Sequence, residues 1–397
     1  MDIAFVVRRF DRGGGIARYT TELAERLSRT NTVTVYAAAW DERPDTGIRF
    51  VRVPFVTSTL LQARHRHAWN TLLEVGSFTR SAAKVVNRSQ HDILHSQGDY
   101  AHGTDVLTAH SCHKAWLHQA RLVAGGPIGR LKKSRANPLH ALVLHAERIG
   151  ITESTRVVAI SERIRSQIVE QYGIPAERIA VIHHGVDTVR FHPENRRRFG
   201  EELRSSLGIG SSEIVAIFPA HEFRRKGLGV LIESLRRLPA TLSLLVVGRD
   251  DPRPYRSRME QYGLLDRVRF VGDAPDIERW YAAADLMVFP TAYDAFGLVI
   301  TEAMASGLPV VTSRDAGAAE LISDGEDGLL LSDPSDVDAV TASMRRLVED
   351  AGLRERIGRR GRERAEMHSW DRACAMTLDL YKIVAREKEA RRRQGRP

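Results

Sequence analysis

One stretch of this sequence decides the fold, and it runs Thr291-Ala-Tyr-Asp-Ala-Phe-Gly-Leu-Val-Ile-Thr-Glu302. The apolar run Leu286-Met-Val-Phe-Pro290 stands directly before it and predicts a buried strand, and residues 298–305 predict the helix that follows. The loop between them carries Asp294, and Glu302 lies in the early turns of the helix. Because a helix start has unpaired N–H groups and the positive end of the helix dipole, it suits a diphosphate. A carboxylate about one turn further in can accept hydrogen bonds from a sugar diol. The stretch therefore predicts a site for a nucleotide-sugar.

Length and composition are those of a soluble globular protein with two domains. The chain has 397 residues, enough for two apolar cores, and no apolar run reaches the length of a transmembrane helix. The N-terminal run Met1–Val7 has no basic region before it, so we expect a first strand rather than a signal peptide. Cys112 and Cys374 are the two cysteines of the sequence, which is typical of a reducing compartment. We therefore expect a cytoplasmic protein.

The net charge of +9 favours an anionic partner, such as nucleic acid, an anionic membrane or a phosphorylated substrate. No recognisable nucleic-acid-binding module or aromatic signature occurs, so we expect no nucleic-acid partner. Residues 70–86 and 121–149 carry basic residues beside apolar ones. In the second segment these include Arg121, Arg130, Lys132, Lys133 and Arg135. This surface is open to two interpretations, a peripheral contact with anionic lipid headgroups on the inner face of the cytoplasmic membrane or a solvated helix face.

Apolar strand patterns alternate with helical patterns along most of the chain, which indicates a parallel α/β architecture. In the first half we expect strands at 3–7, 33–37, 48–53, 93–95, 106–109, 157–160 and 180–182, and helices at 16–29, 137–149 and 161–172. The polar, Arg-rich segment 187–210 lacks periodicity and predicts the domain junction. In the second half we expect strands at 214–218, 242–247, 268–271 and 286–289 and one opening at Pro309, with helices at 228–238, 276–284, 298–305, 334–350 and 370–387.

A basic motif, Arg224-Arg225-Lys226-Gly227, follows the strand that ends at Phe218-Pro219. It stands where open α/β sheets bind ligands, at the carboxyl end of a strand. Lysine offers a point charge and arginine a planar fork, and both suit phosphate oxygens. The alternative is a solvated basic turn.

Three consecutive glycines, Gly13, Gly14 and Gly15, lie between the first strand and the first helix. Glycines there allow the backbone to approach a ligand closely and aim the helix start at an anion. The spacing does not match the G-x-G-x-x-G pattern of a dinucleotide site, and an ordinary turn between strand and helix is the alternative.

His110 ends the apolar run that begins at Val106, so it is expected at the carboxyl end of a strand, where it could orient or polarise a sugar hydroxyl. A satisfied core histidine is one alternative. Zinc bound by His110, Cys112, His113 and His118 is another, but the sequence has no second cluster with ligand spacing and no H-E-x-x-H motif. Asp294 and Glu302 are likewise open to interpretation as a catalytic carboxylate pair of the kind that glycosidases use.

The ordered set of these motifs resembles the retaining GT-B glycosyltransferases of family four, also called group 1, and within them the lipopolysaccharide core glucosyltransferases. The resemblance covers nearly the whole chain. Besides the motifs above it includes Ser161, His184-Gly185-Val186-Asp187, Ala305-Ser-Gly-Leu-Pro-Val310, Gly317, Glu320, Asp324-Gly325 and Asp327-Gly328. The run Glu222-Phe-Arg-Arg-Lys-Gly227 carries the likeness to the lipopolysaccharide enzymes.

The resemblance implies an α/β GT-B fold, with two Rossmann-like domains facing across a cleft. Residues 1–187 with 371–390 are expected to form an acceptor-side domain that includes a C-terminal crossover helix. Residues 188–370 are expected to form the nucleotide-sugar-binding domain, and 391–397 a disordered tail.

The same resemblance implies the roles of individual residues. Arg225 and Lys226 would hold the diphosphate, and the backbone of Phe296, Gly297 and Leu298 would meet phosphate and sugar. Asp294 would contact sugar hydroxyls, and Glu302 the ribose diol. Gly14 and Gly15 would leave room for the phosphate, and His110 would lie beside the transferred sugar, so His110 and Asp294 are the catalytic candidates.

Three positions depart from the family pattern. Asp294 stands where the family usually has Glu, His221 where it often has Arg, and His184 where Asn is common. By the same resemblance, Arg224 or Arg225 is expected to take over the role of the arginine that His221 replaces.

The expected activity is transfer of a hexose, with UDP-glucose as the preferred donor, to a lipid-linked or polysaccharide acceptor such as lipopolysaccharide core. Retention at the anomeric carbon and no requirement for a metal or cofactor are expected with it. The alternatives are a GDP-mannose-dependent mannosyltransferase, a nucleotide-sugar epimerase of the same fold, and a basic protein that only binds.

Overall fold

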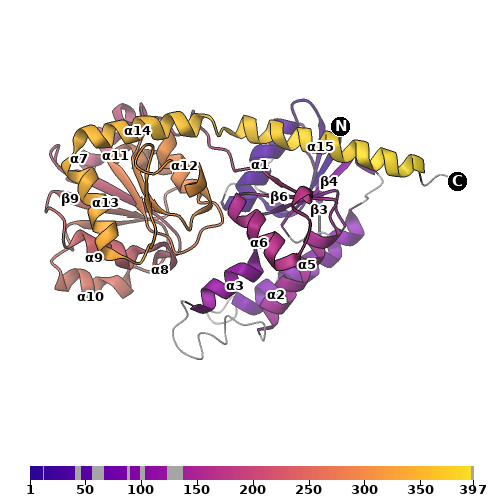
Figure 1. Ribbon diagram of the computed structural model, residues 1–397, viewed down its shortest axis with the longest axis horizontal. Helices are drawn as coiled ribbons and strands as arrows, with labels where there is room; N and C mark the ends of the chain where they lie inside the picture. Colours follow the sequence, from indigo (N-terminus) through magenta and orange to yellow (C-terminus); the bar gives the residue numbers. More distant parts are fainter. Residues whose placement is uncertain are drawn as a thin grey trace. The chain divides into compact units, whose positions relative to one another are not determined.

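The chain folds into two α/β units. The computed structural model describes residues 1–11, 13–40, 46–55, 67–86, 90–98, 103–122 and 137–394. Unit 1 comprises Met1–His183 together with the segment from Trp370 onward, and unit 2 comprises His184–Ser369. Each unit is built around one parallel sheet with helices on both sides (Figure 1). The prediction of two Rossmann-like domains is therefore confirmed.

In the described part of unit 1, the sheet has seven strands in the order β3-β2-β1-β4-β5-β6-β7. The strands are β1 (Asp2–Phe10), β2 (Thr32–Trp40), β3 (Arg49–Arg52), β4 (Ile93–Gln97), β5 (Val106–Ala109), β6 (Arg156–Ala159) and β7 (Ile179–Val181). In register, Ile3 of the central strand β1 pairs with Val33 on one side and Ile93 on the other. The strand order reverses direction at β1, and this is the point where such sheets bind ligands beyond their carboxyl ends.

Among the described residues, seven helical elements cover the sheet of unit 1. They are α1 (Gly15–Leu27), α2 (His67–Val85), α3 (His113–Leu122), α5 (Pro138–Glu153), α6 (Glu162–Tyr172), the short 3-10 turn η3 (Ala176–Arg178) and α15 (Trp370–Gln394). Alternate residues of β1 point to opposite faces. Ala4 and Val6 share a core with Phe78 of α2. Phe5 contacts His95, which reaches Tyr381 of α15 on the other face.

The sheet of unit 2 has six strands in the order β10-β9-β8-β11-β12-β13. The strands are β8 (Ile214–Pro219), β9 (Leu242–Val247), β10 (Val268–Gly272), β11 (Leu286–Phe289), β12 (Val310–Ser313) and β13 (Leu329–Leu331). The helical elements are η4 (Arg196–Gly200), α7 (Glu201–Ser206), α8 (Phe223–Lys226), α9 (Leu228–Leu235), α10 (Arg253–Gln261), α11 (Ile277–Ala283), α12 (Leu298–Ala305), η5 (Gly317–Leu321), α13 (Val337–Glu349) and α14 (Ala351–Glu366).

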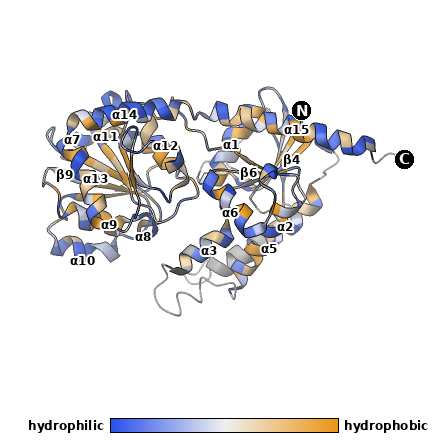
Figure 2. Ribbon diagram, in the orientation of Figure 1, coloured by the Kyte–Doolittle hydropathy of each residue, from blue (hydrophilic) through white to orange (hydrophobic). Residues whose placement is uncertain are grey.

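The central strands are mostly apolar because helices cover both faces of each sheet. Residues 3–7 of β1 are at most 1% exposed, and every residue of β9 is buried. Figure 2 shows the strands of both sheets as apolar and the outward surfaces of helices such as α10 and α14 as polar. Within the described residues, no helix is both long enough and apolar enough to cross a bilayer.

The sequence pattern misses the helices α3, α10 and α14, and α14 shows the reason most clearly. Part of its buried face consists of glycines, which give no apolar periodicity. A Cβ atom on Gly358 would lie 2.2 Å from the carbonyl oxygen of Gly307, so the helix packs there with its backbone. In α10, Met259 is the buried residue, which leaves no stripe to detect.

Two further expectations need correction. The helix α15 continues to Gln394, so residues 391–394 of the tail expected to be disordered are helical, and 395–397 lie outside the described residues. The segment 187–210, expected to lack periodicity, contains η4 and α7. Arg204 of α7 ties this polar segment to the core of unit 2. Its buried guanidinium donates to Asp285 at 2.9 Å and to the carbonyl oxygen of Ala283 at 3.1 Å.

Replacing Arg204 with Met is expected to destabilise unit 2 by about 3 kcal/mol, because it leaves the half-buried Asp285 carboxylate without this partner. Replacing Arg197 with Met is the matched control, since Arg197 is 79% exposed and its pair with Glu194 lies in solvent. Its effect should stay within about 0.5 kcal/mol. Urea unfolding measures both free energies, and equal losses in the two variants would contradict a role for Arg204 in the core.

Candidate active site

The predicted site residues of unit 2 lie on the segments that follow two neighbouring strands. These residues are Arg225, Lys226, Asp294, Phe296, Gly297, Leu298 and Glu302. The strands β8 and β11 are parallel neighbours, with Leu286 paired to Ala216. Because parallel strands end at the same edge of a sheet, the loop after β8 and the loop after β11 meet there. The structure therefore brings together two motifs that lie about seventy residues apart in the sequence.

Lys226 and Asp294 join the two loops by an ion pair between Nζ and Oδ2. The side chain of Lys226 is 9% exposed, and its ammonium lies 5.1 Å from the ring centroid of Phe289. Burial lowers the pKa of Lys226 below the usual lysine value, and the Asp294 carboxylate opposes that shift. The second carboxylate oxygen of Asp294 accepts from the backbone N–H of Phe296 at 3.3 Å. Asp294 thus fixes both the ammonium and the loop that leads into α12.

Arg225 ties the same two loops together through its backbone and its side chain. Its guanidinium pairs with Glu222 and donates to the carbonyl oxygen of Tyr293. Its own carbonyl oxygen accepts from the N–H of Ala292 at 3.0 Å. The side chain remains 34% exposed, so it can still meet a ligand at this edge.

Two glycines allow the loops to approach each other. Gly227 has φ +92°, and a Cβ atom there would lie 2.3 Å from the carbonyl oxygen of Pro290. Gly297 also has φ +92° and stands immediately before the first residue of α12. L-residues rarely adopt this conformation, so both positions need glycine. The turn at Gly297 directs the start of α12 toward the sheet edge where Lys226 lies.

Glu302 is 3% exposed in the second turn of α12. The hydroxyl of Tyr281, from α11, donates to its Oε2 at 3.3 Å and also lies 3.2 Å from the carbonyl oxygen of Val299. The expectation that a buried Glu302 needs a partner is met by Tyr281, which sequence reasoning did not identify. No pattern in the sequence connects α11 with α12, so only the packing of the two helices reveals this contact.

His184 is a second residue whose position the sequence did not explain. Its buried ring lies 4.9 Å from the ring of Phe296, centroid to centroid. It therefore supports the loop before α12 from within unit 2. Asp187, in the same motif, accepts from the backbone N–H groups of Val189 and Arg190 and forms a local turn.

The predicted residues of unit 1 lie at the carboxyl edge of its own sheet. His110 follows β5 and is 9% exposed, and its ring packs edge-on against Tyr19 of α1 at 5.1 Å. Its Nε2 lies 3.0 Å from Oε1 of Gln97. Burial lowers the pKa of His110 to about 3, so the imidazole is neutral at physiological pH. A neutral ring can orient a hydroxyl but does not supply a positive charge.

Within the described residues, neither the backbone conformation nor the packing at the start of α1 requires glycine at positions 14 and 15. Gly14 has an extended backbone that any residue adopts, with φ −157°. A Cβ atom at Gly14 or Gly15 would meet no atom within 4 Å. Both residues are exposed, and their expected role beside a ligand stays a prediction.

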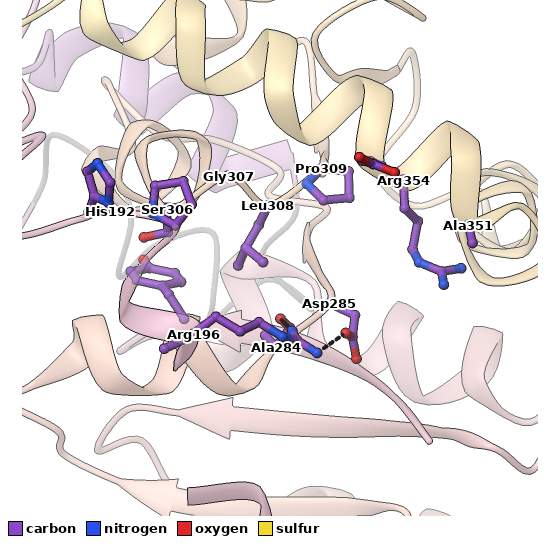
Figure 3. Close-up of a pocket in the computed structure, with 14 residues that line it drawn as sticks. His192, Arg196, Ala284, Asp285, Ser306, Gly307, Leu308, Pro309, Ala351 and Arg354 are labelled. Carbon is purple, nitrogen blue, oxygen red and sulfur yellow. Dashed lines mark hydrogen bonds and ion pairs between the residues drawn. The ribbon is translucent and has the colours of Figure 1, made fainter. Parts of the chain in front are cut away.

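A cavity of about 340 Å³ lies elsewhere in unit 2 (Figure 3). Arg196 and Asp285, which pair at 2.8 Å, line it together with Pro309 and Arg354. Asp285 and Pro309 directly precede β11 and β12, so the cavity opens at the amino edge of the sheet. None of the predicted site residues lines it, and parallel sheets bind their ligands at the opposite edge.

The part of the chain that the structure describes contains no group of three His, Cys, Asp or Glu side chains arranged to hold a metal ion. Several residues expected on a basic membrane-facing surface, among them Arg130, Lys132 and Lys133, lie outside the described residues. The side chain of Arg121 also lies outside them.

The paired Rossmann-like units and the basic edge of unit 2 define a glycosyltransferase of the GT-B class. Family models agree, since Glycosyltransferase Family 4 matches residues 13–190 and Glycosyl transferases group 1 matches residues 199–364. The chain belongs to this family of group 1 glycosyltransferases.

Relatives over nearly the full length support the assignment. The D-inositol 3-phosphate glycosyltransferase of Thermomonospora curvata is 31% identical over 406 residues, covering 93% of this chain and 90% of that protein. The lipopolysaccharide glucosyltransferase WaaG of Escherichia coli is 25% identical over 393 residues, covering 96% of each.

Solved structures show the same fold. The crystal structure of WaaG superimposes with a TM-score of 0.77 at 22% identity, covering 96% of this chain and 99% of that one. The Anabaena protein HepE in complex with UDP and glucose gives a TM-score of 0.70 at 19% identity, with coverage of 96% and 99%.

Acidification is expected to weaken unit 1 because His95 and His110 cannot take up protons in the folded state. Burial lowers the pKa of each to about 3, whereas an unfolded histidine titrates near 6.5. Between these values the unfolded chain binds more protons, so the free energy of unfolding falls as the pH falls, by up to about 1.4 kcal/mol per pH unit for each histidine.

Carbon-detected titration of the histidine rings measures this directly. The signals of His95 and His110 should stay in the neutral position from pH 8 to pH 5. A midpoint near 6.5 for either ring would contradict the burial that the structure gives it.

Proposed function

We propose that this protein transfers a hexose from a nucleoside-diphosphate sugar to a lipid-linked or polysaccharide acceptor, with retention at the anomeric carbon. The observation that carries the proposal is the grouping at the carboxyl edge of unit 2. It combines the ammonium of Lys226, the guanidinium of Arg225, the start of α12 and the buried carboxylate of Glu302. Cations and a helix start suit a diphosphate, and a carboxylate one turn inside the helix suits a ribose diol.

UDP-glucose is the preferred donor. This choice is supported by the relative named lipopolysaccharide glucosyltransferase and by the similar fold of HepE, which was solved with UDP and glucose. GDP-mannose is the alternative donor. For the acceptor, the relative named D-inositol 3-phosphate glycosyltransferase adds inositol 3-phosphate as an alternative to lipopolysaccharide core.

In the proposed reaction, the acceptor oxygen bonds to the anomeric carbon from the face that the diphosphate leaves. The bond between that carbon and the phosphate oxygen breaks, and the acceptor proton passes to the departing phosphate. Arg225, Lys226 and the dipole of α12 stabilise the charge that develops on the diphosphate, so we propose that no metal is needed. Activity that survives chelation by EDTA supports this part of the proposal.

Lys226 keeps donor capacity for the phosphate although it is paired. An ammonium has three N–H donors, and Asp294 takes one of them. Asp294 is proposed to hold Lys226 in place and to present its carboxylate to a sugar hydroxyl. His110 is proposed to orient a hydroxyl of the transferred sugar, for which its neutral ring is suited. Gly14 and Gly15 are proposed to leave room for the phosphate.

Removing the ammonium is expected to weaken donor binding strongly. Lys226→Met should raise the Kd for UDP roughly tenfold to a hundredfold, the range that the loss of a charge-assisted hydrogen bond corresponds to. The double variant Lys226→Met/Asp294→Asn removes the pair without leaving a lone carboxylate, so it separates lost binding from local strain. Arg256→Ala, on the exposed face of α10, is the control. Isothermal titration with UDP measures all three, and wild-type affinity in both Lys226 variants would refute the phosphate role.

Glu302 allows the ribose to be tested apart from the phosphates. Glu302→Gln should weaken binding of UDP by about tenfold, since one charge-assisted hydrogen bond is lost. Binding of inorganic pyrophosphate should stay the same, because that ligand has no ribose. An equal loss for both ligands would show that the substitution disturbs the site as a whole.

A panel of thermal-shift measurements identifies the donor, because a ligand that binds the native state raises the melting temperature. UDP, GDP, UDP-glucose and GDP-mannose form the panel. Omitting the acceptor then tests the alternative reaction, since an epimerase converts the donor without an acceptor and a transferase does not. A protein that binds none of the four would contradict the proposal.

A further inference from the structure

A continuous chain of buried polar side chains links His110 to the last helix within unit 1. The hydroxyl of Tyr381, on α15, lies 2.5 Å from Nδ1 of His95. Nε2 of His95 lies 2.7 Å from the hydroxyl of Thr108 and 3.1 Å from Nε2 of Gln97. Oε1 of Gln97 then lies 3.0 Å from Nε2 of His110. All five side chains are buried, and four of them are 0% exposed.

The strand register explains how these residues meet. Gln97 on β4 pairs with Thr108 on β5, and His95 is two residues earlier on the same strand as Gln97. Residues two apart on a strand share a face, so His95 and Gln97 both point toward α15. His110 follows β5 directly and completes the row.

Burial fixes the protonation states of the side chains in this hydrogen-bonded row. It lowers the pKa of His95 and of His110 to about 3, and it raises the pKa of Tyr381 well above 10. At physiological pH both imidazoles are therefore neutral and the Tyr381 hydroxyl keeps its proton. Each ring has one N–H donor and one nitrogen that accepts, so fixing one contact determines the role of the other nitrogen.

The orientation of the Gln97 amide sets the direction of the hydrogen bonds. An amide oxygen can only accept, so Nε2 of His110 carries the hydrogen and donates to Oε1 of Gln97. An amide nitrogen can only donate, so Nε2 of His95 accepts from Gln97. His95 then carries its hydrogen on Nδ1 and donates it to the oxygen of Tyr381. The contacts of Gln97 with both histidines, and of His95 with the Tyr381 oxygen, are all compatible with this direction.

We infer that Gln97 is a positioning residue that fixes His110 in the Nε2–H tautomer, and that the Tyr381 oxygen on α15 supports this orientation by accepting from His95. The Nδ1 atom of His110, which is buried in this structure, is then the ring nitrogen without a hydrogen. The effect of this tautomer on sugar transfer rests on the proposed function. The tautomer itself depends only on the buried chain.

A substitution at Tyr381 is expected to change the tautomer of His110 without touching His110 itself. In Tyr381→Phe the Nδ1–H of His95 loses its acceptor in a buried place, which is unfavourable. Rotating the Gln97 amide by half a turn restores a hydrogen bond to His95, because His95 can then carry its hydrogen on Nε2 and donate it to the amide oxygen. The amide nitrogen now faces Nε2 of His110, which must accept, and His110 changes to the Nδ1–H tautomer. A contact that merely filled the core would not transmit such a change.

Nitrogen NMR of the full chain labelled with 15N-histidine tests the inference. Long-range correlations distinguish a protonated ring nitrogen from an unprotonated one, and a His110→Asn variant assigns the His110 signals. The wild-type protein should show His110 as Nε2–H. Tyr381→Phe and Gln97→Leu should both increase the Nδ1–H form. Ser96→Ala is the matched control, because Ser96 is equally buried on the same strand but points to the other face and donates to the carbonyl oxygen of Gly98.

Turnover of UDP-glucose provides the second readout. Gln97→Leu should lower kcat about tenfold, the factor that one lost hydrogen bond corresponds to, with KM for UDP-glucose unchanged. Ser96→Ala should keep the wild-type kcat.

The inference is overturned if wild-type His110 is Nδ1–H, if neither variant changes its tautomer, or if Gln97→Leu keeps the wild-type kcat. A wild-type protein that does not turn over UDP-glucose contradicts the proposed donor instead. The nitrogen shifts then decide the tautomer without any activity.

Discussion

The ion pair between Lys226 and Asp294 is the contact on which the geometry of unit 2 depends at its carboxyl edge. It joins the loop after β8 to the loop after β11, and a nearly buried ammonium needs such a partner to stay charged. Gly227 brings the two loops close enough for the pair to form. Asp294 also accepts from the backbone of Phe296 and so connects the ammonium to the start of α12. One carboxylate therefore positions both the cation and the helix end that we propose for the diphosphate.

The histidines of unit 1 act without charge. Deep burial keeps His95 and His110 unprotonated. Neutral imidazoles act through the direction of their hydrogen bonds rather than through charge, and direction requires a fixed tautomer. We infer that the hydrogen-bonded side chains from Tyr381 to His110 supply that fixed direction, although Tyr381 lies 286 residues from its partner His95 in the sequence.

Motifs with a strong local signal were predicted correctly at the level of secondary structure. The strand at 286–289 and the helix at 298–305 occur at the expected residues, and so does the alternation of strands and helices that indicated two parallel sheets. Helices without an apolar stripe were missed. In α14 the buried glycines give no periodic signal, and in α15 the charged end continues as helix beyond the residue where the pattern stops.

The sequence by itself determined the fold class, the family and the identities of the candidate site residues, because spacing and residue type are local properties of the chain. Only the tertiary structure decided the partners of those residues. In the folded protein Lys226 pairs with Asp294, Glu302 accepts from Tyr281, and His110 contacts Gln97. Each pair joins different strands, loops or helices, and the packing of the sheets and helices brings them within hydrogen-bonding distance. No sequence period encodes that distance, because it depends on strand order and on the shapes of the packed side chains.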